Sequence, residues 1–238
     1  MKYTVEQLIS NLKQSDPNLR YSAIKALDAI GDKRAIRSLV ETLEDDRTDI
    51  SRAAALALSN IGDKQTAYQI LNKLTQLNDN DEKSYKVGFN ISLILGKIAD
   101  QTFVDVLLSL IETKNSVVRA SVAWTLGELG DIKTLDSLIK ILEDKNPKVR
   151  TGAIASISLL GGEEVIELLI KTLEDDDDDK VREMAIVGLG ELNSDKALRV
   201  LEWTAQNAIN ISNYEAYPIA WAAAKALEII KHRRSIIG

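Results

Sequence analysis

Side chains that commonly carry out acid–base, nucleophilic or metal chemistry are scarce in this chain of 238 residues. It contains a single histidine, His232, and no cysteine. Cysteine–histidine nucleophilic pairs, zinc sites built on cysteine and metal sites built on several histidines are therefore excluded. Several carboxylates have no partner base or metal ligand in the sequence: Glu128, Glu163, Glu164 and Glu191. We expect no catalytic residue, no metal site and no cofactor.

The run of aspartates at 175–179 is the strongest candidate for a cation site. A calcium loop of the EF-hand type places its acidic residues at alternate positions around a turn glycine. The run has neither the alternate spacing nor the glycine. We therefore interpret 175–179 as a solvated turn between helices, and His232 as part of a basic end of a C-terminal helix.

The composition restricts the class of protein further. Hydrophobic residues make up 45% of the chain and charged residues 28%, with a formal net charge of −6, 3 prolines and 12 glycines. These values disfavour disulfide-stapled, disordered and turn-rich β proteins. The acidic balance disfavours nucleic acid as a partner, and no apolar run is long enough to cross a membrane. We expect a cytoplasmic protein that binds neither nucleic acid nor membranes.

Apolar residues recur along the whole chain with a period close to 31 residues. The period is marked by one anchor position per repeat: Gly31, Gly62, Ala99, Gly130, Gly161, Asn193 and Lys231. Twelve, eight, four and one residues before each anchor stand apolar or small residues, a spacing that places them on one face of a helix. A second apolar stripe follows each anchor. We call the helix after an anchor the first helix of a repeat, and the helix before the next anchor its second helix.

This pattern predicts an all-α protein, an α-α superhelix or solenoid of seven antiparallel helix pairs. An isolated pair cannot bury both of its apolar stripes, so neighbouring pairs must stack. We therefore expect a single domain over 1–238, with repeats at about 1–31, 32–62, 63–99, 100–130, 131–161, 162–193 and 194–231.

Prolines and glycines agree with these helix boundaries. Pro17 and Pro147 stand where a second helix begins, and Asp16 and Asn146 before them are candidate N-caps. Glycine at the anchor is typical of a helix that ends in the left-handed conformation.

The segment 146–175 and its counterparts resemble HEAT repeats, specifically the short HEAT-like repeats of the phycobilisome lyase (E/F-type) family. The resemblance rests on Asp16-Pro17, Val118-Arg119, Val149-Arg150, Val181-Arg182, Gly127 with Gly130-Asp131, and Gly31-Asp32. It implies that the second helices line a concave face and the first helices form a convex back. HEAT-repeat deoxyhypusine hydroxylases bind iron through several His-Glu pairs, and this sequence contains none of them.

Some repeats depart from the pattern. Gly88 replaces the arginine expected eleven residues before the third anchor, and Ser51 replaces the arginine of the second repeat. Extra residues around 76–84 and 205–217 lengthen two repeats, and we expect them to extend helices or loops at one edge.

Four arginines occupy the position eleven residues before an anchor: Arg20, Arg119, Arg150 and Arg182. This position points sideways, toward the neighbouring repeat. We interpret the four as a structural ladder of ion pairs with the acidic turns between helices. A row of ligand-binding arginines is the alternative.

Positions on the second helices that face away from the core stripe are the candidate binding residues on the concave face. They are Tyr21, Arg52, Leu56, Phe89, Leu93, Trp124 and Glu128. Exposed apolar patches commonly mark interaction sites, and tryptophan is a preferred anchor. The alternative is that tight curvature buries these side chains. We interpret the aromatic residues Tyr214, Tyr217 and Trp221 as a cap of the array, with a second contact region as the alternative.

The sequence therefore favours a non-catalytic protein–protein interaction scaffold that holds a partner protein in its concave groove. The alternative, implied by the resemblance, is a subunit of a phycobilin lyase or a related factor that handles phycobiliproteins, with a bilin or a phycobiliprotein as its partner.

Overall fold

The computed structural model describes residues 3–79, 81–210 and 217–237. Within these residues the chain forms fourteen α-helices, joined by short turns and 3-10 helices, and no strand. They pair as predicted, so the all-α fold of seven antiparallel helix pairs is confirmed. None of the described helices combines the length and the apolar character that a membrane span requires.

The first helices are α1 (Val5–Asn11), α3 (Ile36–Thr42), α5 (Lys64–Thr75), α7 (Val104–Leu110), α9 (Leu135–Lys140), α11 (Glu163–Asp175) and α13 (Asp195–Asn210). The second helices are α2 (Pro17–Ile30), α4 (Thr48–Ile61), α6 (Glu82–Ile98), α8 (Ser116–Leu129), α10 (Pro147–Leu160), α12 (Asp179–Leu192) and α14 (Tyr217–Ile237). Short 3-10 helices occur at Lys33–Ala35, Gln101–Phe103, Ile132–Thr134 and Ile141–Glu143.

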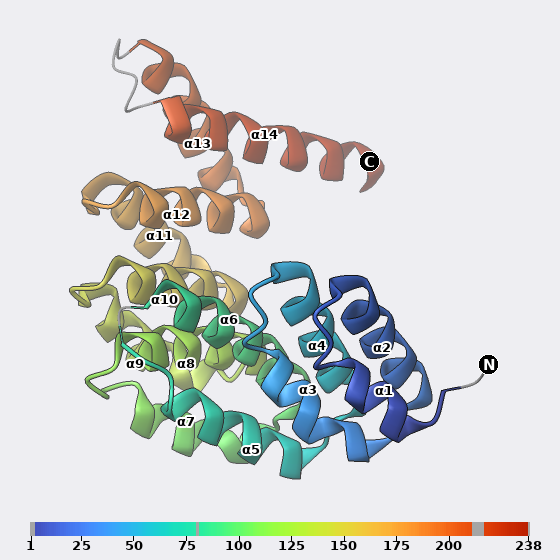
Figure 1. Ribbon diagram of the computed structural model, residues 1–238. Coiled ribbons are helices and arrows are strands. Elements are labelled where there is room, and N and C mark those ends of the chain that lie inside the picture. The colour runs from blue at the N-terminus through green and yellow to red at the C-terminus, as the bar shows by residue number, and fades with distance from the viewer. Residues whose placement is uncertain (1–2, 80, 211–216, 238) are drawn as a thin grey trace. The chain divides into compact units, whose positions relative to one another are not determined.

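The helices belong to two compact units, unit 1 (Met1–Leu129) and unit 2 (Gly130–Gly238). In unit 1 the second helices α2, α4, α6 and α8 pack side by side in sequence order, and each first helix packs against the second helix of its own repeat (Figure 1). In unit 2 the helices α10, α12 and α14 form the equivalent row. Each unit therefore consists of two layers, one of first helices and one of second helices.

The predicted helix starts are confirmed at both prolines. The carboxylate of Asp16 accepts a hydrogen bond from the backbone N–H of Asn18 at 2.9 Å, and Pro17 is the first residue of α2. The side chain of Asn146 does the same for Lys148 at 2.9 Å ahead of Pro147. Each cap satisfies one of the N–H groups that a helix N-terminus leaves without a partner.

The helix ends follow the prediction only in part. Gly31 and Gly130 have positive φ angles of 71° and 67°, and Asn193 takes the same left-handed region at 48°. Gly62 is an exception, because it ends α4 with an extended backbone at φ −68°. A Cβ atom on Gly62 would lie 2.5 Å from the carbonyl oxygen of Leu58, so close approach to the helix end, not backbone conformation, favours glycine there.

The predicted core stripe is buried in most repeats. The row four residues before each anchor is buried throughout: Leu27, Leu58, Leu95, Leu126, Ile157, Leu189 and Leu227. Leu19 and Ile30 of α2 belong to the same stripe by pattern but are exposed. Helix α2 has a neighbouring second helix only on the α4 side, so the ends of its stripe lack the cover that interior repeats receive.

The first insertion lengthens helix α6, and its turn makes hydrogen bonds to the start of α8. Helix α6 has 17 residues, whereas α2, α4 and α8 have 14. In the turn before α6, the carboxylate of Asp79 accepts from the backbone N–H of Ser116 at 2.8 Å, and the carbonyl of Leu77 accepts from the Asn115 side chain at 2.7 Å. The inserted turn of one repeat thus caps the second helix of the next. The final helix also differs from the pattern, because α14 continues past Lys231 to Ile237.

Truncation of the core stripe should affect stability according to position in the stack. Leu126 is fully buried in α8, and we expect Leu126→Ala to lower the free energy of unfolding by about 2–5 kcal/mol. Leu12→Ala should cost less, because Leu12 ends the short helix α1 at one side of unit 1. Urea unfolding followed by far-UV circular dichroism measures both values. Equal losses would contradict the expectation that the place of a residue within unit 1 sets its contribution to stability.

Candidate functional site

All seven candidate binding residues lie on the second-helix layer of unit 1. We call this surface the unit 1 face and define it by Tyr21 on α2, Arg52 and Leu56 on α4, Phe89 and Leu93 on α6, and Trp124 and Glu128 on α8. Because α2, α4, α6 and α8 are consecutive neighbours, residues at equivalent positions on them line up across the row.

An aromatic pair connects α6 and α8 on the unit 1 face. The ring centroids of Phe89 and Trp124 lie 5.5 Å apart, and their planes meet at 88°. This edge-to-face arrangement is favoured because the positive edge of one ring meets the negative face of the other. Both rings and the neighbouring Leu93 are half-buried. Packing thus fixes the rings while part of each stays accessible to solvent.

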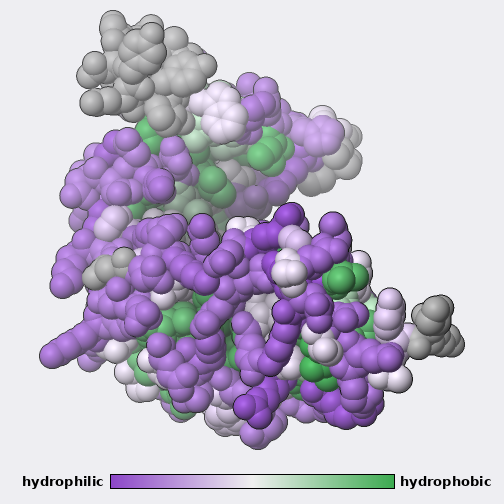
Figure 2. Space-filling view, in the orientation of Figure 1, coloured by the Kyte–Doolittle hydropathy of each residue, from purple (hydrophilic) through white to green (hydrophobic). Residues whose placement is uncertain are grey.

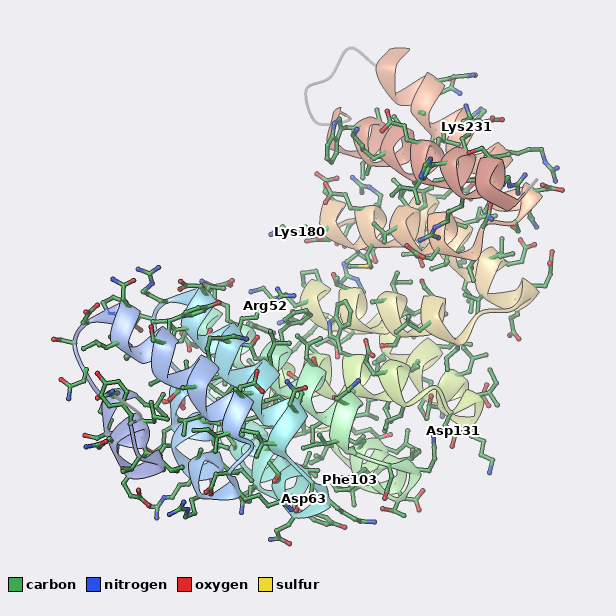
Figure 3. All side chains as sticks on the ribbon, turned by 90° about the vertical axis from the view of Figure 1, so that its right-hand side faces the viewer. Arg52, Asp63, Phe103, Asp131, Lys180 and Lys231 are labelled. Atoms are coloured by element: carbon green, nitrogen blue, oxygen red, sulfur yellow. The ribbon has the colours of Figure 1, made fainter. Side chains whose placement is uncertain are left out.

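More strongly exposed side chains lie on α2 and α4. Leu56 is 56% exposed and Tyr21 is 42% exposed. Arg52 is exposed near the N-terminal end of α4, at the opposite end of unit 1 from Asp63 and Phe103 (Figure 3). The apolar surface of the unit 1 face therefore extends from α8 toward α2, and its exposure is greatest on α4.

Glycines on α6 bring α6 and α8 close together. A Cβ atom on Gly88 would lie 2.4 Å from Oγ of Ser121, and one on Gly96 would lie 2.6 Å from Cβ of Glu128. The Glu128 side chain thus lies over Gly96. The departure from the repeat pattern at Gly88 has a packing reason, because an arginine there would separate the two helices that hold the aromatic pair.

The four ladder arginines share a contact that the sequence pattern did not indicate. The guanidinium of each one donates to backbone carbonyls of the turn that precedes its own helix. The acceptors are Gln14 and Ser15 for Arg20 (2.9 and 3.0 Å), Thr113 and Lys114 for Arg119 (2.8 and 2.9 Å), Asp144 for Arg150 (2.9 Å) and Asp176 for Arg182 (2.6 Å). Each arginine therefore holds together the two helices of its own repeat.

Arg20 and Arg150 also reach the following repeat. Nε of Arg20 donates to Asp45 at 2.7 Å, and Nε and Nη2 of Arg150 donate to the two oxygens of Asp176 at 2.8 Å each. Arg182 instead pairs with Asp179 on its own helix. The acidic run at 175–179 is therefore a turn whose first part binds two arginines, the guanidinium of Arg150 through a carboxylate and that of Arg182 through a carbonyl.

The pairing of Arg150 with Asp176 shifts both pKa values. The hydrogen bonds that Arg150 donates to the Asp176 carboxylate raise the pKa of Arg150. Burial raises the pKa of the Asp176 carboxyl, but hydrogen bonds from Arg150 and from the backbone N–H of Asp178 outweigh it and hold the pKa below its ordinary value. The ionised pair is thus the favoured state at neutral pH.

A second row of ion pairs lies at the other end of the second helices. Asp63 and Asp100 follow two anchors, and they pair with Lys33 and Lys64 of the preceding repeat, the latter at 3.1 Å. The hydrogen bond from Lys33, with one from the backbone N–H of Thr66, lowers the pKa of Asp63 to about 2. The recurring Asp-Lys dipeptide after Gly31 and Gly62 was the available signal for this row.

Trp221, interpreted as part of a cap or of a second contact region, has an exposed side chain on the last helix. It lies on α14 ten residues before Lys231, the same offset as Tyr21, Arg52 and Phe89 in their repeats, and it is 57% exposed. It lines an apolar groove between α12 and α14. Tyr214 and the side chain of Tyr217 lie outside the described residues. Among the residues that the structure describes, no group of three or more His, Cys, Asp or Glu is placed to hold a metal ion.

Replacement of Asp176 should reduce the acid sensitivity of the protein. Because its pKa is lower in the folded chain, the ionised carboxylate stabilises the fold above its ordinary pKa near 4, and this contribution is lost as pH falls through the lower folded value. We expect Asp176→Asn to destabilise the protein at pH 7 by about 1–3 kcal/mol and to flatten the stability loss below pH ~5. Urea unfolding at several pH values measures this. Glu202→Gln on α13 is the control and should keep the wild-type slope; an unchanged slope for Asp176→Asn would contradict the assignment.

Comparison with known proteins agrees with the repeat architecture. A family model of HEAT repeats matches residues 5–85, 81–157 and 135–210. No curated protein matches the sequence. Among solved structures, a chain from the complex of CpcE and CpcF of phycocyanin lyase from Nostoc sp. PCC7120 is 22% identical and has a TM-score of 0.50, with 97% of this chain and 96% of that chain covered.

Two further solved structures align with most of this chain. A chain from a structure of Kap95p with RanGDP has a TM-score of 0.59 at 12% identity, over 95% of this chain and 36% of that chain. Human deoxyhypusine hydroxylase has a TM-score of 0.48 at 17% identity, over 96% of this chain and 84% of that chain. At these identities the likeness concerns the fold alone. The family match covers most of the sequence, and the chain belongs to the HEAT-repeat family.

Proposed function

We propose that this protein is a non-catalytic scaffold for protein–protein interaction and that the unit 1 face binds a segment of its partner. The observation that supports the proposal most directly is the aromatic pair of Phe89 and Trp124, which shares its helix layer with the exposed side chain of Leu56. Binding hot spots are typically aromatic anchors that are already held in place before the partner arrives.

The surroundings of the aromatic pair suit an interface of this kind. Interfaces commonly have an apolar centre and a polar rim. The apolar side chains of Phe89, Leu93 and Trp124 share the unit 1 face with two exposed charged residues, Arg52 on α4 and Glu128 on α8. Charges at such a rim steer the encounter with a partner and add little affinity. The binding energy should therefore come mainly from the aromatic pair of Phe89 and Trp124.

A phycobilin lyase subunit is the second candidate function. It is supported by the fold likeness to the CpcE–CpcF complex over nearly the whole chain and by aromatic rings on which a planar bilin can stack. In this case the thiol that accepts the bilin would belong to the client protein. Each of three cavities lined by described residues, of about 260, 220 and 210 Å³, is smaller than the roughly 300–1,000 Å³ typical of cofactor sites. Visible absorbance on mixing the purified protein with a bilin would support the lyase candidate.

Truncation of Trp124 tests the proposed binding face. We expect Trp124→Ala to weaken binding about thirtyfold or more, because loss of a central aromatic anchor costs at least ~2 kcal/mol. The fold should survive, since the side chain is only half-buried. Proteins captured from a lysate of the source organism by the wild-type chain and by the variant are compared by quantitative mass spectrometry, and the affinity of a differential partner is then measured by calorimetry.

A matched tryptophan control is available on the first-helix layer of unit 2. Trp203 on α13 is 67% exposed, and Trp203→Ala should leave capture by the unit 1 face unchanged. If Trp124→Ala lowers the melting temperature strongly while the folded fraction binds with wild-type affinity, the ring is a packing residue and the proposed face is wrong.

A further inference from the structure

Unit 2 is strongly acidic, whereas unit 1 is almost neutral. Residues 130–238 contain 14 Lys and Arg against 19 Asp and Glu, a net charge of −5. Residues 1–129 contain 16 against 17, a net charge of −1. Nearly all of the net charge of −6 therefore belongs to unit 2, and the aspartate run directly before α12 contributes much of it. A surface of this charge attracts basic partners and repels nucleic acid and anionic membranes.

An apolar groove lies on the second-helix layer of this acidic unit. It has a volume of about 260 Å³ and runs between α12 and α14. Three large apolar side chains line it and remain about half exposed: Val187 at 51%, Trp221 at 57% and Ile229 at 48%. Hydrophobic side chains are also visible over α12 and α14 in the space-filling view (Figure 2). Such exposure of several large apolar groups in one groove is typical of a binding site.

Small residues form the floor of the groove. A Cβ atom on Gly190 would lie 3.1 Å from Cβ of Ala226, so α12 and α14 approach closely at this point. The larger side chains of Val187 and Trp221 stand at the walls on either side of this contact. The groove is therefore built into the packing of the two helices and does not depend on a loop.

The charged groups of the groove differ in their pairing. Glu191 accepts from Arg233 at 2.9 and 3.2 Å, and Lys225 donates to Glu228 at 2.8 Å. Glu183, also on the wall, has no ion pair among the residues that the structure describes. The carboxylate of Glu183 can therefore form an ion pair with a lysine or arginine of a partner.

We propose that this groove binds one large apolar side chain of a basic segment of a partner protein, with a lysine or arginine of that segment paired to Glu183. The volume favours a side-chain anchor, because about 260 Å³ is below the usual range for a drug-sized ligand or a cofactor. The charge of unit 2 selects a basic segment. This site is separate from the unit 1 face and does not depend on the function proposed for that face.

A display library of random peptides, selected on the full-length protein, tests the proposal. The enriched peptides should combine a large apolar residue with two or more lysines or arginines, and their binding should weaken with salt. Fluorescence anisotropy with a synthetic copy of an enriched peptide then compares variants. We expect Trp221→Ala to weaken binding about tenfold or more and Glu183→Lys about three- to tenfold. Val187→Ala provides a second apolar truncation on the opposite wall.

Matched controls separate local from general effects. Trp203→Ala removes an exposed tryptophan from α13, and Glu143→Lys makes the same charge change at an exposed position of unit 2; each should change the affinity less than twofold. Thermal melts show whether each variant folds. Enriched peptides that are neutral or acidic, or that bind the Trp221 and Glu183 variants as well as the wild type, would overturn the proposal, as would the absence of any enriched peptide. Peptides whose binding is lost in Trp124→Ala but not in Trp221→Ala or Glu183→Lys would support the unit 1 face and overturn the proposed groove.

Discussion

Neighbouring second helices must approach closely, and much of the structure depends on this constraint. On α6 the positions of Gly88 and Gly96 leave room for Ser121 and Glu128 of α8, and on α12 Gly190 leaves room for Ala226 of α14. Because protein interiors are close-packed, a larger side chain at any of these points would force the helices apart.

Close approach of α6 and α8 brings Phe89 to Trp124, and close approach of α12 and α14 forms the floor of the apolar groove. The same constraint thus shapes both candidate binding surfaces.

Charged side chains hold the ends of the second helices, while apolar side chains hold their middles. At the N-terminal ends, Arg20 and Arg150 bind carbonyls of their own turn and carboxylates of the next turn. At the C-terminal ends, Lys33 and Lys64 pair with the aspartates that follow the next anchor. The Arg20 and Arg150 pairs are largely shielded from solvent and use fork-like geometry, which makes them stronger than the exposed lysine pairs.

The fold could be predicted from the sequence because the spacing of apolar residues along a helix is a local pattern, and the same pattern occurs in every repeat. The row from Leu27 to Leu227 is buried as its spacing predicts. The exposure of side chains on the second-helix layer was harder to predict, because it depends on how a neighbouring helix covers each side chain. Phe89 and Trp124 are partly covered by each other, whereas Trp221, expected to cap the array, remains open. The contacts of the arginines with their own turns carry no sequence signal at all, because a backbone carbonyl is present at every residue.

The turn that contains Asp79 makes two repeats unlike the others. Repeat proteins evolve by gaining, losing and exchanging units, which requires each unit to fit any neighbour. Here the insertion before α6 supplies one cap contact of α8 one repeat later, from Asp79 to the N–H of Ser116, and the carbonyl of Leu77 holds the side chain of Asn115. If either repeat is duplicated or exchanged alone, the backbone N–H of Ser116 loses Asp79, while Asn115 of the fourth repeat still accepts from the N–H groups of Val117 and Val118. The third and fourth repeats therefore share cap contacts that an exchange of either repeat alone would remove.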